Sequence, residues 1–197
     1  MSHPSLFQLS GLGYPPAGLN DATLLIIDAQ EEYRSGDLAL PGLQPALAEI
    51  ATLLERARAA GTPVVHVRHL GIPGGLFDPE GPRGAILAEL TPTANETVVT
   101  KRLPNAFAGT ELHPLLGELG RRHLIVCGFM SHMCVSSTVR VAKDLGYRCT
   151  LVDSACATRP LVGLDGVMDA TILHRAAMTA LADNFAVIVP TADDLPA

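Results

Sequence analysis

Six short runs of β-branched and aliphatic residues, separated by longer segments, constrain the fold of this chain more than any other feature of its sequence. The runs are nearly continuous rather than alternating, which is typical of strands that are buried on both faces of a parallel sheet. We therefore expect a strand at each run. They cover residues 23–27, 63–67, 97–100, 123–127, 148–152 and 185–189.

Two of the intervening segments have the three- and four-residue apolar spacing of an amphipathic helix. Segment 43–60 has this spacing and stops at Gly61, and segment 134–145 repeats it and stops at Gly146. Strand–helix alternation of this kind predicts an α/β fold: a single-domain, doubly wound, mostly parallel six-stranded sheet with helices on both faces.

The first 20 residues differ from the rest because prolines and glycines interrupt them without periodicity. We expect residues 1–20 to form an N-terminal arm without regular structure, suited to covering a neighbouring subunit. Residues 21–197 then form the folded domain.

Composition excludes several classes of protein. The chain has 14 Lys+Arg against 20 Asp+Glu, and this net charge of -6 argues against the basic surface that a nucleic acid requires. No apolar run approaches the ~20 residues of a membrane span, and the start lacks a signal peptide, so we expect no membrane association and a cytoplasmic protein. Four cysteines without a CxxC pair predict free thiols.

Two charged residues follow predicted strands. In open α/β sheets the ligand lies outside the carboxyl ends of the strands, so these positions are candidates for a site. Asp28 follows run 23–27, where poor solvation raises a carboxyl pKa, and Lys101 follows run 97–100, where an ammonium would keep that carboxylate charged. The alternatives are a turn or helix cap for Asp28 and a surface position for Lys101.

Cys134 has the position of a nucleophile. The chain leaves run 123–127, turns at Gly128 and enters a helix with Cys134 in its first turn. Backbone N–H groups and the helix dipole lower a thiol pKa there and stabilise an oxyanion. The alternative is a buried structural thiol, which is the interpretation of Cys127, Cys149 and Cys156.

Together these motifs resemble the isochorismatase-like cysteine hydrolases, the family of nicotinamidases and N-carbamoylsarcosine amidohydrolase. The resemblance covers nearly the whole chain after residue 20. It rests on LIIDAQ at 25–30, KRLPNAFAGT at 101–110, GFMSHMCV at 128–135, AKDLGY at 142–147 and VDSACA at 152–157.

The resemblance implies a catalytic triad of Asp28, Lys101 and Cys134. Asp28 would take the thiol proton, Lys101 would hold that carboxylate charged, and Cys134 would attack a carbonyl to form a thioester. It also implies a cis peptide bond between Phe129 and Met130, which would aim the backbone amides of Met130 and Cys134 at one oxygen as an oxyanion hole.

Five further side chains are expected to bind the substrate. Tyr33 supplies an aromatic wall with a hydroxyl, Phe107 packs over the pocket, and Phe129 and His132 flank the nucleophile. Gln30 would bind the aspartate or the substrate, with a turn-satisfying role as the equal alternative. His132 is not a dyad partner for the thiol, because residues two apart do not face each other on a helix.

We expect no metal and no cofactor. Nicotinamidases carry an Asp-x-His metal motif where this chain has His66-Val67-Arg68-His69, and the Asp is missing. Two histidines three apart on a strand point to opposite faces, so His66 is expected in the core and His69 in the pocket lining. Arg68 is expected in a surface ion pair, with a substrate carboxylate as the alternative. Phosphate-binding glycine patterns are absent.

The favoured function is a metal-independent cysteine hydrolase that cleaves a C–N bond of a small-molecule amide, ureido or lactam substrate. Three alternatives stay open: an isochorismatase-type vinyl-ether hydrolase using Asp28, a non-catalytic oligomeric binding protein, and a thiol redox protein with Cys127 as the resolving partner of Cys134. The high apolar share and the relatives of this family predict a homo-oligomer.

Overall fold

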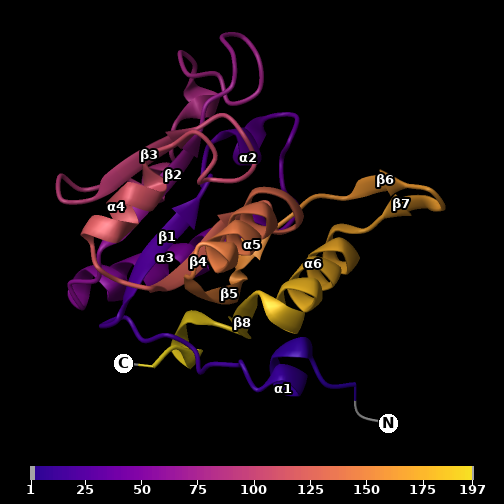
Figure 1. Cartoon of the computed structure of the whole chain (residues 1–197). Coiled ribbons are helices and arrows are strands. Elements are labelled where there is room, and N and C mark those ends of the chain that lie inside the picture. The colour runs from indigo at the N-terminus through magenta and orange to yellow at the C-terminus, as the bar shows by residue number, and fades with distance from the viewer. Residues whose placement is uncertain (1–2, 197) are drawn as a thin grey trace.

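A central parallel sheet organises the computed structural model, which describes residues 3–196 (Figure 1). Its six strands lie side by side in the order β3-β2-β1-β4-β5-β8. They are β1 (Ala22–Ile27), β2 (Val64–His69), β3 (Thr97–Lys101), β4 (His123–Phe129), β5 (Arg148–Ala157) and β8 (Ala186–Val189). In residues 3–196 no helix has the length and apolar character needed to cross a membrane.

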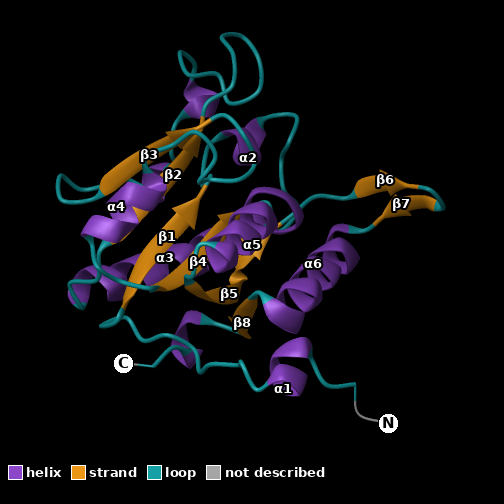
Figure 2. Cartoon of the chain, viewed as in Figure 1, coloured by secondary structure: helices purple, strands orange, loops and turns teal. Residues whose placement is uncertain are grey.

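Helices cover both faces of the sheet (Figure 2). The long helix α3 packs on one face, and α4, α5 and α6 pack on the other. The helices are α1 (Leu6–Ser10), α2 (Glu32–Ser35), α3 (Leu43–Ala59), α4 (Leu112–Glu118), α5 (Ser136–Asp144) and α6 (Ala170–Asn184), with short turns η1 (Pro82–Gly84), η2 (Ala88–Leu90), η3 (Ser131–Val135) and η4 (Ala192–Asp194).

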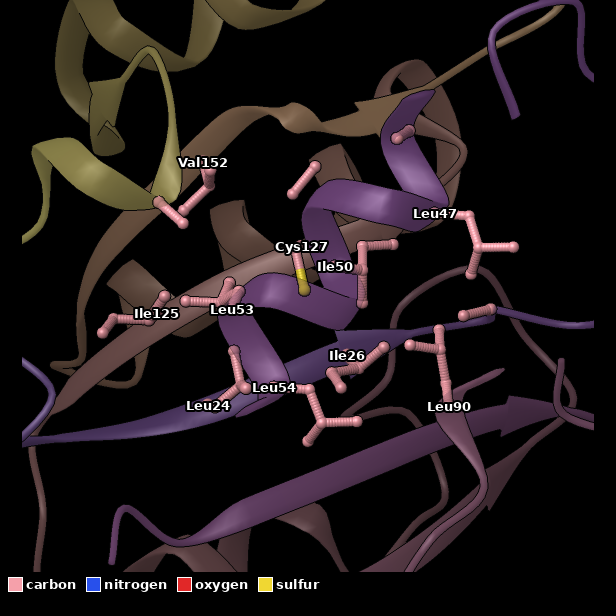
Figure 3. Packing of buried hydrophobic residues seen from close by; sticks show 14 of the residues in the cluster. Leu24, Ile26, Leu47, Ile50, Leu53, Leu54, Leu90, Ile125, Cys127 and Val152 are labelled. Carbon is pink, nitrogen blue, oxygen red and sulfur yellow. The ribbon is translucent and has the colours of Figure 1, made fainter. Parts of the chain in front are cut away.

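Strand β1 shows why its sequence is apolar throughout. Leu24 and Ile26 point to the face under α3 (Figure 3), and Leu25 and Ile27 point to the face under α4 and α5. Successive side chains alternate between the faces, and here both faces are covered, so every position of the strand is buried.

The predicted α/β architecture is confirmed, including all six strands and the helices beginning at residue 43 and near residue 134. Strands β4 and β5 are longer than predicted, because their ends pair with each other beyond an irregularity between Val126 and Gly128. The sequence did not reveal the two-stranded hairpin of β6 (Leu161–Gly163) and β7 (Gly166–Met168), which projects beyond α6 (Figure 1).

The prediction that the N-terminal arm lacks regular structure is wrong for its described part, residues 3–20. It contains helix α1, where Ser5 and Gln8 form a reciprocal capping box. Phe7 is buried edge-on against Tyr14, whose hydroxyl accepts a hydrogen bond from Cys149 N at 3.1 Å. The segment therefore packs on its own domain through the buried Phe7 and the half-buried Tyr14. Met1 and Ser2 of the predicted arm lie outside the described residues.

The strand order places a topological switch between β1 and β4. From β1 the sheet grows through β2 to β3 on one side, and from β4 through β5 to β8 on the other. Ligands of doubly wound sheets bind at the carboxyl ends of the strands beside such a switch. The segments that follow β1 and β4 are therefore where this fold presents a site.

Candidate active site

Asp28 lies directly after β1, at the switch point. Its backbone has a φ of 49°, and its N–H donates to Val67 O at 2.9 Å. Gly128 lies opposite the last residue of β1, and a Cβ on it would approach Ile27 O to 2.1 Å. Glycine is therefore required there for β4 to come this close to β1 and bring its following turn beside Asp28.

Lys101 ends β3, and strand β2 separates it from β1. Two strand spacings amount to about 10 Å, a gap that only a long side chain can cross. The Nζ atom reaches Asp28 Oδ2 at 2.6 Å, and both side chains are fully buried. The surface alternative for Lys101 is wrong, because a buried carboxylate compensates its charge.

Cys134 joins this pair from the turn after β4. Lys101 Nζ donates to Cys134 Sγ at 3.3 Å, and the cysteine is 7% exposed. The turn is a π-helical segment, η3, and α5 begins only after it, so the prediction of Cys134 in the first turn of an α-helix needs this correction. The peptide bond between Phe129 and Met130 is cis.

Burial dominates the protonation of this site. Burial first, and then the neighbouring Asp28 carboxylate, raise the pKa of Cys134 to about 12 against the lowering effect of Lys101. The expectation of a lowered thiol pKa is wrong, because desolvation exceeds the effect of the helical turn. Burial also raises the pKa of Asp28 against the lowering by Lys101, as predicted.

His69 completes the surroundings of the lysine. It lies opposite Lys101 in the register of β2 and β3, and its Nδ1 is 3.0 Å from Lys101 Nζ. An ammonium can only donate, so Nδ1 accepts and the ring proton lies on Nε2. Burial and Lys101 lower the pKa of His69 to about 4. The Lys101 ammonium thus hydrogen-bonds His69 and Cys134 and forms an ion pair with Asp28.

The other residues of the β2 motif point elsewhere. His66 is buried as predicted and hydrogen-bonds Glu96 Oε2 at 3.0 Å, near the opposite end of β2. Arg68 Nε donates to the Gly84 carbonyl at 2.7 Å, which corrects the expectation of a surface ion pair. Residues 3–196 contain no cluster of three or more histidine, cysteine or acidic side chains arranged to hold a metal ion.

An aromatic wall borders the site. The Tyr33 and Phe129 rings are 5.5 Å apart, and both residues are buried. Burial raises the pKa of the Tyr33 hydroxyl, and Asp28 and Cys134 raise it further. The hydroxyl therefore stays protonated beside the trio of Asp28, Lys101 and Cys134. The structure thus places Tyr33, the predicted aromatic wall, beside Phe129, another of the predicted substrate-binding residues.

Phe77 extends this wall from the long loop after β2. Its ring is 5.4 Å from Tyr33 and 4.9 Å from His69. Glu32 anchors the loop, accepting from Phe77 N at 2.9 Å and pairing with Arg83 at 3.3 Å. Sequence reasoning missed this contact because the loop has no periodicity that indicates its path.

Gln30 has the second of its two predicted roles, whereas Phe107 does not have its predicted position. The Gln30 amide is used by backbone, since its Nε2 donates to His69 O and Gly84 O and its Oε1 accepts from His69 N. The geometry thus favours its alternative role of satisfying a turn. Phe107 stacks on Tyr147 next to the start of β5, which is the end of the strand remote from the site. The prediction that Phe107 packs over the pocket is therefore wrong.

His132 and Cys127 also have defined partners. His132 Nδ1 hydrogen-bonds Thr158 Oγ1 after β5, so it is held away from a dyad with the thiol, as expected. Cys127 belongs to the core under α3, whereas Cys134 belongs to the core on the opposite face of the sheet. The redox alternative is therefore contradicted, because the sheet separates the two sulfurs.

Arg159, two residues after β5, is a candidate site residue that sequence reasoning missed. It lowers the pKa of both Tyr33 and His132, although burial is the largest influence on each. Its Nε is buried without a hydrogen-bond partner among the described residues. Inspecting the residues after each strand would have found it, but β5 was expected to end at 152 and extends to Ala157.

Comparison with known proteins gives consistent results. The model of the isochorismatase domain family matches residues 22–193. The chain is 39% identical to a streptothricin hydrolase of Streptomyces noursei, over 88% of this chain and 69% of that protein. It is 30% identical to the maleamate amidohydrolase of Pseudomonas putida, over 76% of this chain and 75% of that protein.

The structural comparison agrees with the sequence comparison. The crystal structure of an isochorismatase from Pseudomonas putida superposes with a TM-score of 0.96 at 54% identity, covering 99% of this chain and 100% of that one. The six-stranded sheet and its helical layers are therefore shared along the full length of both chains.

Proposed function

The chain belongs to the isochorismatase domain family, whose relatives include an amidohydrolase, and we propose that it is a metal-independent cysteine hydrolase of a small amide, ureido or lactam compound. One observation carries the proposal: an ammonium that contacts a buried carboxylate at 2.6 Å and a buried thiol at 3.3 Å. A nucleophile, a base and a group that holds the base charged therefore meet at one point.

In the first half of the reaction, Cys134 Sγ bonds to the substrate carbonyl carbon while its proton passes to Asp28. A thiol with a pKa of about 12 is protonated at neutral pH, so attack and proton transfer occur together. The backbone N–H groups of Met130 and Cys134 stabilise the resulting oxyanion. Protonated Asp28 then gives its proton to the departing nitrogen, which leaves as ammonia or an amine, and a thioester remains.

In the second half, water attacks the thioester carbonyl and gives a proton to Asp28. The C–S bond breaks, the acid leaves, and the sulfur takes back the proton from Asp28. Lys101 remains an ammonium throughout and holds the carboxylate and the thiol in place. No step needs a metal or an organic cofactor, because the protons and electron pairs balance within the trio and the substrate.

Arg159 supports a narrower class of substrate. A guanidinium whose Nε is buried without a partner has a donor available for a ligand, and carboxylates are its strongest small-molecule acceptors. Its influence on Tyr33 and His132 shows that it lies near the aromatic wall. We therefore favour amides that carry a carboxylate, consistent with the resemblance to a maleamate amidohydrolase.

The test is ammonia release from a panel of small amides, ureas and lactams, with and without a carboxylate, by the wild type and by Cys134→Ala. Release that disappears in Cys134→Ala and is unchanged by a chelator supports the proposal. Turnover of isochorismate that persists in Cys134→Ala would instead support the vinyl-ether alternative, which the 54% identity to an isochorismatase favours. Loss of activity on chelation would overturn the metal-independent mechanism.

A homo-oligomer is part of this proposal. The hairpin β6–β7 and the adjoining start of α6 expose several large apolar side chains, and a second copy of the chain is the partner we expect to cover them. They are Val162, Leu164, Val167, Met168 and Ile172. Light scattering should show an oligomer that Val162→Glu weakens. We place the protein in the cytoplasm, consistent with its four free thiols.

A further inference from the structure

A second group of polar side chains holds the turn that carries the thiol. His174 of α6 has its Nδ1 3.0 Å from Ser131 Oγ and its Nε2 3.1 Å from Asp153 Oδ1. Ser131 is the first residue of the π-helical turn η3 and is fully buried, while Asp153 lies on β5. The three residues come from three elements, and none of them belongs to the trio around Lys101.

In the neutral form of His174, Nδ1 accepts a hydrogen bond from the Ser131 hydroxyl, and Nε2 donates to the Asp153 carboxylate, which can only accept. A buried hydroxyl is costly without a partner, so this chain fixes the rotamer of Ser131.

The Asp153 end of this hydrogen-bonded series faces solvent. Asp153 and His174 line a cavity of about 430 Å³ between α3, β5 and α6. Thr158, which also lines this cavity, holds His132, the next residue of the turn. Two consecutive residues of the turn are thus tethered to side chains on the wall of one cavity.

We propose that Ser131, His174 and Asp153 form a hydrogen-bonded relay that positions the turn 130–135 for the reaction. The relay fixes the start of η3 to α6 and β5, so that the Met130 and Cys134 amides and the thiol keep one arrangement. His174 is a positioning residue that acts through Ser131. The inference rests on the proposed role of Cys134 as the nucleophile.

Two substitutions of His174 separate its contact with Ser131, the inner contact, from its contact with Asp153, the outer contact. The amide oxygen of His174→Asn takes the place of Nδ1 and accepts from Ser131, whereas the amide nitrogen of His174→Gln takes the place of Nε2 and donates to Asp153. If the inner contact positions the turn, Ser131→Ala and His174→Gln lower kcat by about 10- to 100-fold with KM nearly unchanged. His174→Asn then keeps kcat within about threefold.

A measurement without substrate tests the same relay. Iodoacetamide should alkylate Cys134 about three times faster in Ser131→Ala and His174→Gln, because a loosened turn opens locally. Mass spectrometry should find Cys127, Cys149 and Cys156 unmodified, and His174→Asn should react like the wild type. His113→Gln is the matched control, since His113 makes a comparable 2.9 Å hydrogen bond to Tyr147 away from the site.

Unchanged alkylation and kcat in Ser131→Ala and His174→Gln would overturn the relay. Equal defects in all the Ser131 and His174 variants, with a lowered Tm and alkylation of the other cysteines, would also overturn it, because they would indicate a packing role only. The proposed function fails separately, by full turnover in Cys134→Ala. The two failures are therefore distinguishable.

Discussion

The same kinds of side chain meet at each end of the strand pair β2–β3: a carboxylate, a histidine and a long basic residue. At the amino end, the oxygens of Glu96 accept from Arg58 at 2.7 and 2.9 Å, from Thr93 N at 3.0 Å and contact His66 at 3.0 Å. The Arg58 guanidinium is the main cause that lowers the pKa of Glu96 to about 2.

At the carboxyl end the carboxylate is less well satisfied. Asp28 has one close cation, Lys101, and neither of its oxygens has a hydrogen-bond partner among the described residues. Its pKa is raised by burial, and a thiol shares its lysine. The same residue types thus form a structural anchor where both carboxylate oxygens have hydrogen-bond donors, and a candidate base where neither oxygen has one.

Replacement of the two carboxylates should give the largest contrast. Asp28→Asn should lower turnover by about 10²–10⁴-fold, because the base that receives the thiol proton is lost. Glu96→Gln should keep turnover within about threefold, since Glu96 contacts no reacting group. Steady-state ammonia release measures both. More than a tenth of wild-type turnover in Asp28→Asn would contradict the assignment of the base.

Removal of the buried cation should be the most destabilising change. Lys101→Met should lower the free energy of unfolding by about 3–5 kcal/mol, because the Asp28 charge stays buried without its partner. Urea denaturation measures the loss. Lys143→Met is the control, since Lys143 is only partly buried and is paired with no carboxylate among residues 3–196. A loss below about 1 kcal/mol would mean that solvent reaches the pair.

The two carboxylates should affect acid stability with opposite signs. The lowered pKa of Glu96 stabilises the fold above its ordinary value of 4.5, and this contribution is lost as pH falls toward 2. Glu96→Gln should cost about 1.5–3 kcal/mol at pH 7 and progressively less below pH 4.5. The raised pKa of Asp28 gives a contribution that is present below 3.8 and lost as pH rises.

Unfolding free energies of the wild type and Glu96→Gln between pH 2 and pH 7 test these signs. Curves that stay parallel over the whole range would contradict the lowered pKa of Glu96. Asp28→Asn, measured over the same pH range, should remove the decrease in unfolding free energy with rising pH that the raised pKa of Asp28 causes.

The smallest effect is expected at the histidine of the carboxyl end. His69→Leu should lower kcat about tenfold, because one of the three acceptors around the Lys101 ammonium is lost. His69→Asn keeps an acceptor at the position of Nδ1 and should stay within about threefold. Equal kcat values for the two variants would show that Lys101 does not need this contact.

The architecture was predictable because its signal is local. Near-continuous apolar runs such as 22–27 report burial on both faces, and that pattern survives in the sequence itself. Asp28, Lys101 and Cys134 could be singled out because each follows a strand at the carboxyl edge. Which groups they touch could not be read, since Lys101 reaches across β2 to a partner 73 positions earlier in the chain.

The sequence by itself determined the strands, their parallel arrangement and the three candidate residues at strand ends, because periodicity and spacing are properties of neighbours along the chain. Its motifs carried the resemblance to the family. Only the tertiary structure decided protonation and contacts. Burial raises the thiol pKa that the helical turn alone would lower, the backbone occupies the Gln30 amide, and His174 of α6 hydrogen-bonds the turn that carries the thiol. Desolvation and long-range contacts depend on segments far apart in sequence, so they exist only in the folded protein.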